Sequence, residues 1–182
     1  MLAVQRGDAE AFEVLFRKYA GALVRFASGM LGSRARGEEV AQETFAHVFR
    51  SRYRYRPRAR FTTWLYRIAT NLCVSDLRRA ERRRAVQGDE AVRDPADVAD
   101  PRLETAETVA GRRERLAVVR EALLTLPPRQ RAALWLVRVE GCSYEEVAGR
   151  IGCTVGAVKS LVHRATLALQ AAIEGAESEG GG

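Results

Sequence analysis

The stretch CSYEEVAGRIGCTVGAVKSLVHRATLALQAAI, residues 142–173, decides the fold of the C-terminal half of this chain. Ser143 and Glu146 have the S-x-x-E spacing of a capping box, which marks the start of a helix. Gly152 can end that helix, because glycine adopts the positive φ of a tight turn, and Thr154 can cap the helix that follows. Two short helices joined in this way predict a helix-turn-helix.

The spacing of apolar residues in this stretch favours the same structure over its alternative, a plain helical hairpin. Ala148 is small enough to let the two helices touch, and Val158 and Leu161 would hold the second helix against the first. In a helix-turn-helix the second helix enters the major groove of DNA with its N-terminus first. The outward candidates for contact with duplex DNA are Thr154, Gly156, Lys159, Ser160, His163 and Arg164.

Residues 1–84 predict a second helical domain, because apolar residues recur there at helical spacing and strand signals are almost absent. We expect one helix to begin after Asp8 and to end at Gly32, and another to run from about Glu38 to Arg50. The apolar face of the second helix would be Val40, Ala41, Phe45, Val48 and Phe49, with Glu39, Gln42, Glu43 and His47 facing outward or sideways. Taken alone, such a polar face is typical of a solvated surface.

The segment RYRYRPRARFTTWLYRIATN, residues 52–71, interleaves arginines with aromatic residues. Pro57 favours a loop in its first half, and a helix pattern resumes at Phe61, with Thr62 or Thr63 as its expected cap. Steps of 100° per residue place Trp64, Arg67, Asn71 and Arg78 along one flank of this helix, beside its buried stripe. A ring, an amide and guanidinium groups together can stack a base, read its edge and bind phosphate. Trp64 could also be an ordinary core residue.

Charge divides the 182-residue chain into distinct segments, although the net charge is only +7. Residues 50–84 carry twelve arginines against two acidic residues, whereas residues 85–112 carry three arginines against seven acidic residues. The acidic segment contains prolines and no sustained helical stripe, so we expect a flexible linker there. The sequence therefore predicts an all-α protein with two small helical domains, residues 1–84 and 113–174, followed by a disordered tail over 175–182.

Other classes of protein find little support in the sequence. No apolar run reaches the roughly 20 residues that span a bilayer, and the N-terminus lacks the apolar core of a signal peptide. The three cysteines are scattered, which suits a reducing cytoplasm better than a disulfide framework. No nucleotide-binding or zinc-protease motif is present, and His47 and His163 have no neighbouring ligand set. We therefore expect no catalytic residue, no metal and no cofactor.

The order of these features resembles that of the extracytoplasmic-function (ECF) group of sigma factors of bacterial RNA polymerase. GDAEAFEVLFRKYAGALVRFA, GEEVAQETFAHVFR and FTTWLYRIATNLCVSDLRR are similar to their second conserved region. LPPRQRAALWLVRVEGCSYEEVAGRIGCTVGAVKSLVHRATLAL is similar to their fourth region. The resemblance extends over about residues 7–172 and implies a factor that binds core polymerase, recognises promoters, opens DNA and starts transcription.

The resemblance also implies roles for particular residues. Asn71 would match the asparagine that reads the minus-ten element, and the loop from Arg52 to Arg60 would hold a flipped base. The fourth region would also meet the β flap of polymerase, and an anti-sigma factor is an expected partner. The expected minus-ten contacts are Arg54, Arg56, Arg58, Arg60, Trp64, Arg67, Asn71 and Arg78. The expected minus-35 contacts lie within Thr154–Arg164, and Glu39, Gln42 and Glu43 would contact the clamp helices of the β′ subunit.

Three alternatives stay open at the level of sequence. A stand-alone helix-turn-helix regulator would bind duplex DNA without polymerase, but it has no use for a surface that stacks bases. An enzyme acting on nucleic acid would need an acid/base or metal cluster. A degenerate relative could bind polymerase without opening DNA.

Overall fold

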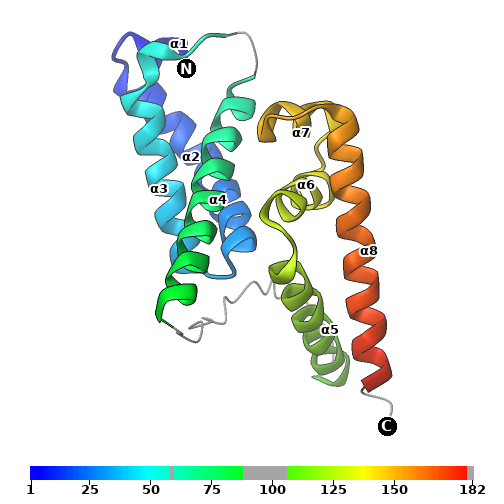
Figure 1. The fold of residues 1–182 in the computed structure, drawn as a ribbon. Coiled ribbons are helices and arrows are strands. Elements are labelled where there is room, and N and C mark those ends of the chain that lie inside the picture. Colours follow the sequence, from blue (N-terminus) through cyan, green and yellow to red (C-terminus); the bar gives the residue numbers. More distant parts are fainter. Residues whose placement is uncertain (58–59, 88–105, 180–182) are drawn as a thin grey trace.

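The computed structural model describes residues 1–57, 60–87 and 106–179, and every regular element within these ranges is a helix. This confirms the all-α fold. The elements are α1 (Leu2–Gln5), α2 (Ala9–Leu31), α3 (Arg34–Arg50), the short 3₁₀ helix η1 (Arg52–Arg54), α4 (Phe61–Gln87), α5 (Ala106–Thr125), α6 (Pro128–Arg138), α7 (Tyr144–Ile151) and α8 (Val155–Glu179). Helices α2, α3 and α4 form an N-terminal bundle, and α5 to α8 form the C-terminal half (Figure 1).

Side-chain caps set the ends of the N-terminal helices. The Asp8 carboxylate accepts a hydrogen bond from the Ala11 N–H at 2.9 Å, and Gly32 ends α2 in the left-handed conformation with φ of 71°. Helix α3 begins at Arg34 rather than near Glu38, because Ser33 caps it. Ser33, a residue type that caps helices, is the signal in the sequence for this earlier start.

Two details of the N-terminal bundle differ from expectation. Helix α4 already begins at Phe61, so Thr62 and Thr63 lie inside its first turn and do not precede it as caps. Phe49 is 43% exposed, whereas Thr44 is fully buried in α3. Thr44 can be buried because its hydroxyl donates to the Val40 carbonyl at 2.7 Å, which satisfies the polar group.

The helix-turn-helix forms as predicted from α7, a turn and α8. Ser143 and Glu146 make both hydrogen bonds of the capping box, and Gly152 occupies the turn with φ of 67°. Val158 is fully buried, but Val162 is more deeply buried than the expected Leu161. Helix α8 continues to Glu179, into the segment expected to be a disordered tail, since that segment contains no proline and has alanine and glutamate to sustain a helix.

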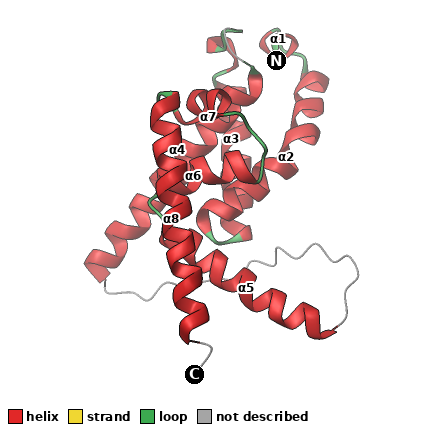
Figure 2. Cartoon of the chain, turned by 90° about the vertical axis from the view of Figure 1, so that its right-hand side faces the viewer, coloured by secondary structure: helices red, strands yellow, loops and turns green. Residues whose placement is uncertain are grey.

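The N-terminal bundle and the C-terminal half pack against each other. Helix α7 packs against α4, and α6 packs against both α2 and α4, so that one hydrophobic cluster runs through the whole molecule (Figures 1 and 2). The predicted linker falls largely on residues 88–105, outside the described residues, and α4 and α5 are helical at its two ends. The sequence predicts two domains, but no local pattern in it indicates that they pack together.

A buried arginine stabilises the junction between the halves. Arg131 of α6 is 3% exposed and donates hydrogen bonds to the carbonyls of Met30, at the end of α2, and of Leu124 and Leu126. A cation is favourable at a helix C-terminus, where carbonyls lack intrahelical partners. Burial lowers the pKa of Arg131 to about 10, so the guanidinium is still charged at neutral pH.

Candidate nucleic-acid interface

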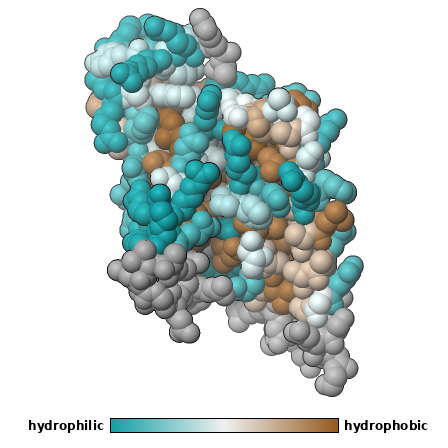
Figure 3. Space-filling view, in the orientation of Figure 1, coloured by the Kyte–Doolittle hydropathy of each residue, from teal (hydrophilic) through white to brown (hydrophobic). Residues whose placement is uncertain are grey.

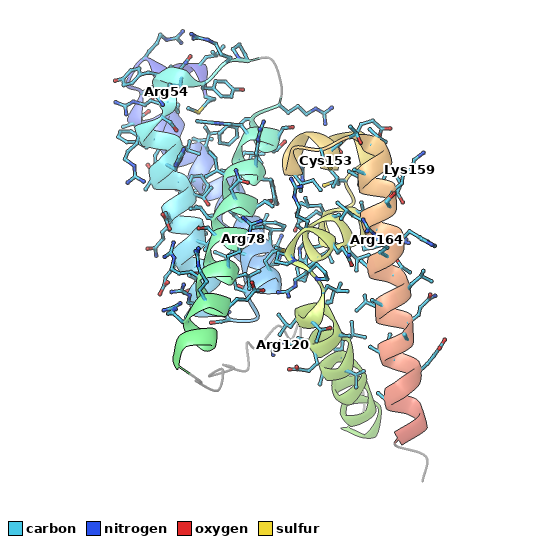
Figure 4. All side chains as sticks on the ribbon, in the orientation of Figure 1. Arg54, Arg78, Arg120, Cys153, Lys159 and Arg164 are labelled. Carbon is cyan, nitrogen blue, oxygen red and sulfur yellow. The ribbon has the colours of Figure 1, made fainter. Side chains whose placement is uncertain are left out.

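The flank of α4 predicted to face DNA is exposed in the structure. Arg67, Asn71 and Arg78 are all exposed, and the buried side chains Leu65, Ile68 and Ala69 fix the helix so that this flank faces out. Trp64 is half-buried, so it can serve both as a packing residue and as part of the flank. Figure 4 labels Arg78 on α4.

Tyr55 anchors the arginine-rich loop that precedes this helix. Its ring lies 5.2 Å from the ring of Trp64, centroid to centroid, and its carbonyl accepts a hydrogen bond from Gln5 at 2.9 Å. Tyr55 is 8% exposed, and the sequence prediction for this loop, which concerned its arginines and a flipped base, gave Tyr55 no role. The anchor leaves Arg54 and Arg56 exposed on either side of a buried ring. Arg58 lies outside the described residues.

Arg52, Phe49 and Tyr53 form a stack next to the anchor. The Arg52 guanidinium lies 4.1 Å from the ring centroid of Phe49 and 4.3 Å from that of Tyr53. Both rings are partly exposed, at 43% and 63%. Cation–π contact and stacking on an arginine plane are arrangements found where proteins hold single-stranded nucleic acid.

Two of the predicted minus-ten residues, Arg60 and Arg67, lie next to the helix-turn-helix. Arg60 forms an ion pair with Glu146 of α7, with 2.8 Å between Nη1 and Oε1. A methyl group in place of the Gly152 hydrogen would lie 3.7 Å from Nη2 of Arg67. The turn of the helix-turn-helix therefore lies directly beside the flank of α4.

The N-terminal part of α8 presents its predicted residues to solvent. Thr154 caps the helix by accepting a hydrogen bond from the Ala157 N–H at 3.2 Å. A Cβ at Gly156 would meet no atom within 4 Å, so a close approach by another molecule is possible there. All six expected contacts are exposed, namely Thr154, Gly156, Lys159, Ser160, His163 and Arg164. Figure 4 labels Lys159 and Arg164 on α8, which α7 separates from α4.

Comparison with known proteins identifies the family of the chain that carries these two surfaces. The family model "Sigma-70 region 2" matches residues 15–83, and "Sigma-70, region 4" matches residues 116–169. The RNA polymerase sigma-H factor of Pseudomonas aeruginosa is 36% identical over 94% of this chain and 90% of its own length. The ECF RNA polymerase sigma-E factor of Haemophilus influenzae is 34% identical over 89% of this chain and 87% of its own.

The chain belongs to the ECF sigma factors. It is therefore a factor that directs transcription initiation, and a stand-alone helix-turn-helix regulator is not favoured, because region 2 is present as well.

Solved structures share this fold. The sigma factor RpoE, in complex with the anti-sigma factor NepR from Bartonella quintana, has a TM-score of 0.72 and is 23% identical over 91% of this chain and 98% of its own. CnrH, in complex with the cytosolic domain of CnrY, has a TM-score of 0.70 and is 25% identical over 96% of this chain and 94% of its own.

A third surface of this sigma factor lies on α3. Glu39, Gln42 and Glu43 are exposed there, as predicted from the helical spacing. Arg36 pairs with Glu39 at 2.7 Å and also with Asp76 of α4, which ties the acidic face of α3 to α4. The hydrogen bond with Asp76, more than any other contact, raises the pKa of Arg36.

Two further observations concern the whole described surface. In the described part of the chain, no helix combines the length and the apolar character that crossing a membrane requires. Apolar surface gathers over α5 and α8 in Figure 3, where Leu116 and Leu167 are more than half exposed. Hydrophilic surface covers the side formed by α3 and α4 in the same view.

Proposed function

We propose that this sigma factor reads the minus-ten element with the arginine-rich loop and the exposed flank of α4. The exposed flank carries this proposal: Arg67, Asn71 and Arg78 face outward beside Trp64, on a helix that its buried stripe holds rigidly. An exposed asparagine in a helix interior has no packing purpose, whereas its amide can pair with a base edge. The arginines that would contact phosphate are Arg54, Arg56, Arg58, Arg60, Arg67 and Arg78.

The free-energy cost of extruding bases determines how many protein contacts DNA opening requires. Extruding a base from the duplex costs a few kcal/mol, and stacking a base on an aromatic ring contributes about 1–3 kcal/mol. One stacked base thus roughly offsets one extrusion. DNA opening then requires several contacts at once, which core polymerase and the phosphate-binding arginines would supply.

The second reader is the N-terminal half of the exposed face of α8. It would enter the major groove at the minus-35 element, with Thr154, Gly156, Lys159, Ser160, His163 and Arg164 as the contacting residues. The chain between the two readers has 18 residues outside the described ranges, 88–105, which can extend to at most about 60 Å. Readers joined by such a chain can engage separated elements at a raised effective concentration.

Polymerase and an anti-sigma factor complete the proposed set of partners. Glu39, Gln42 and Glu43 would bind the clamp helices of the β′ subunit, and region 4 would meet the β flap. The acidic face of α3 suits a basic partner, because Glu43 and the Arg36-paired Glu39 are exposed carboxylates there. An anti-sigma partner is expected from the family, and CnrH, which has the same fold, was solved in complex with another protein, the cytosolic domain of CnrY. The factor would act with polymerase in the cytoplasm.

A reconstituted transcription assay tests the proposal. The sigma factor is added to core RNA polymerase with promoter fragments from a genomic library, and a fluorescent base in the minus-ten strand reports opening. We expect opening and transcript start on a subset of fragments. A complete absence of opening on all fragments, with the sigma factor bound to core, would leave the degenerate relative as the correct interpretation.

A further inference from the structure

Helix α1 lies at the end of the N-terminal bundle where α3 leads into the arginine-rich loop (Figure 1). It contacts both α2 and η1, and its Val4 side chain is 1% exposed. A helix of four residues is too short to be stable by itself, so α1 is ordered by what it packs against. None of the residues proposed above to contact DNA or polymerase lies on α1.

A tight turn folds α1 back onto the bundle. Gly7 lies between α1 and α2 with φ of 92°, a conformation that L side chains rarely adopt, and its N–H donates to the Val4 carbonyl at 3.1 Å. The N–H of Asp8, the cap of α2, donates to the Ala3 carbonyl at 3.2 Å. The same few residues therefore set the start of α2 and the position of α1.

Gln5 reaches from α1 to the backbone of the arginine-rich loop. Its Nε2 donates a hydrogen bond to the Tyr55 carbonyl at 2.9 Å, and Gln5 is itself half-buried. The start of the loop has local support from α3, because the Ser51 N–H donates to the His47 carbonyl at 2.9 Å. Tyr55 lies further along the loop, and the bond from Gln5 holds the backbone there.

The Tyr55 ring anchors the same residue from the other side. It lies 5.2 Å from the Trp64 ring of α4, centroid to centroid, and the Trp64 ring lies 6.3 Å from that of Phe61. The Phe61 ring in turn lies 5.6 Å from the ring of Tyr19 of α2. Aromatic pairs at these separations are stabilising. The loop is thus fixed at Tyr55 by α1 through its carbonyl, and by α4 and α2 through its ring.

The backbone of Tyr55 converts this anchor into an orientation of the neighbouring arginines. Its φ of −60° and ψ of 130° are extended, and successive side chains of an extended chain point to opposite faces. Because the Tyr55 ring is buried, Arg54 and Arg56 point outward, and both are exposed. A shift of the Tyr55 backbone would therefore re-aim both guanidinium groups.

We propose that Gln5 is a positioning residue of the minus-ten reader: by holding the Tyr55 carbonyl, it fixes the loop in the shape that accepts an extruded base. The inference rests on the function proposed above for this loop. An anchored loop loses less conformational freedom when DNA binds, so more of its binding free energy remains for affinity and discrimination. Gln5 acts through Tyr55, and its loss should lower base discrimination without changing the charge-driven part of DNA binding.

Gln5→Glu tests this role by removing the donor alone. The carboxylate keeps the size and shape of the amide, but it has no N–H and faces the Tyr55 carbonyl, which is another acceptor. Gln5→Lys restores a donor on a side chain of similar reach. Gln130→Glu is the matched control, because Gln130 is also half-buried but lies in α6 of the C-terminal half.

Selection of randomised minus-ten fragments by each variant bound to core polymerase measures base discrimination at every position. A salt titration of the same complexes measures the phosphate contacts. We expect Gln5→Glu to lower discrimination by about fivefold or more at one position at least, as the loss of a part-buried hydrogen bond implies. The salt slope and the affinity for core should stay unchanged. Gln5→Lys and Gln130→Glu should retain the discrimination of the wild type.

A second variant reaches the anchor through the backbone. Gly7→Ala introduces a Cβ into open space, but at a φ that alanine rarely adopts, so it should displace α1 without a steric clash. Gly141→Ala is its matched control, because it creates the same kind of strain at φ of 64°, also in open space, between α6 and α7. Gly7→Ala should lower base discrimination in the same way as Gln5→Glu.

Hydrogen–deuterium exchange of the free proteins reports on the loop directly. The Arg54 N–H donates to the Ser51 carbonyl and the Tyr55 N–H to the Arg52 carbonyl, so both amides are protected while the loop keeps its shape. They should exchange about fivefold faster or more in Gln5→Glu and Gly7→Ala than in the wild type and the two controls. A helix α1 that served stability alone would lower the melting temperature without changing the base preferences.

The outcomes separate this inference from the proposed function. A melting scan establishes which variants are folded. Unchanged discrimination in folded Gln5→Glu or Gly7→Ala, or an equal loss in Gln130→Glu, would overturn the positioning role, although the sigma function stands. If the wild type bound to core shows no base preference anywhere in the minus-ten element, the proposed function of the loop fails first.

Discussion

The Tyr66 hydroxyl donates a hydrogen bond to Oε2 of Glu140 at 3.0 Å, which joins α4 to the turn after α6. Tyr66→Phe removes the donor and leaves a partly buried carboxylate without it. We expect the free energy of unfolding to fall by about 1.5–3 kcal/mol, as for other hydrogen bonds to charged groups. Urea denaturation measures the change. Tyr53→Phe, at a ring that is 63% exposed, should change it by less than about 0.5 kcal/mol, and an equal loss in both variants would contradict the assignment.

Alkaline pH should destabilise the protein through Cys73. Burial raises the pKa of this thiol from its ordinary 9 to about 12. Above pH 9 the unfolded chain loses the thiol proton while the folded chain keeps it, so the free energy of unfolding falls as the pH rises from 9 towards 12. Cys73→Ala should flatten this decline relative to the wild type, although its stability at pH 7 is lower. Urea denaturation at several pH values between 7 and 11 measures the slopes, and parallel slopes would count against the buried thiol as a cause.

Asn71 and Arg78 should separate base reading from phosphate binding on the same helix flank. Asn71→Ala should reduce discrimination among minus-ten sequences by about 1–3 kcal/mol at one position, and leave the salt dependence of binding unchanged. Arg78→Ala should weaken binding to all sequences and reduce the salt slope by about 1. Competition binding of the polymerase complex to randomised minus-ten fragments, at several salt concentrations, measures both. A uniform loss of affinity in Asn71→Ala would show that this residue does not read a base.

The acidic face of α3 should control binding to polymerase. Glu43→Arg reverses one exposed charge on that face, and we expect the affinity for core polymerase to fall about tenfold or more, because like charges opposed at an interface cost several kcal/mol. Glu10→Arg, at an exposed position in the first turn of α2, is the matched charge control. Titration of labelled sigma factor with core measures both. An unchanged affinity in Glu43→Arg, or an equal loss in Glu10→Arg, would place the docking surface elsewhere.

Local features of the fold could be predicted from sequence because their causes are local. Asp8, Gly32 and the capping box at Ser143 act within one helical turn, and periodicity alone placed Arg67 and Asn71 outside the core. The same method missed Tyr55, since a buried ring in an arginine-rich loop has no periodic signal.

The association of the two halves could not be predicted in this way. It depends on Trp135 meeting a glycine more than a hundred positions earlier in the chain, and on Arg60 meeting Glu146. In a single sequence, neither a glycine nor an exposed arginine indicates which distant residue it contacts. The sequence therefore predicted the helices that carry both proposed readers, and only the structure shows that α7 packs between them.

Gly29, the glycine beneath Trp135, is a position where a substitution should have an effect without altering any proposed DNA contact. A substitution at Gly29 would place a Cβ 2.2 Å from Cζ3 of Trp135 and disturb the packing of α6 on α2, although it changes no residue proposed to contact DNA. A screen for variants with lowered stability should therefore return changes at this position, where a comparison of the proposed promoter-binding residues alone would find nothing altered.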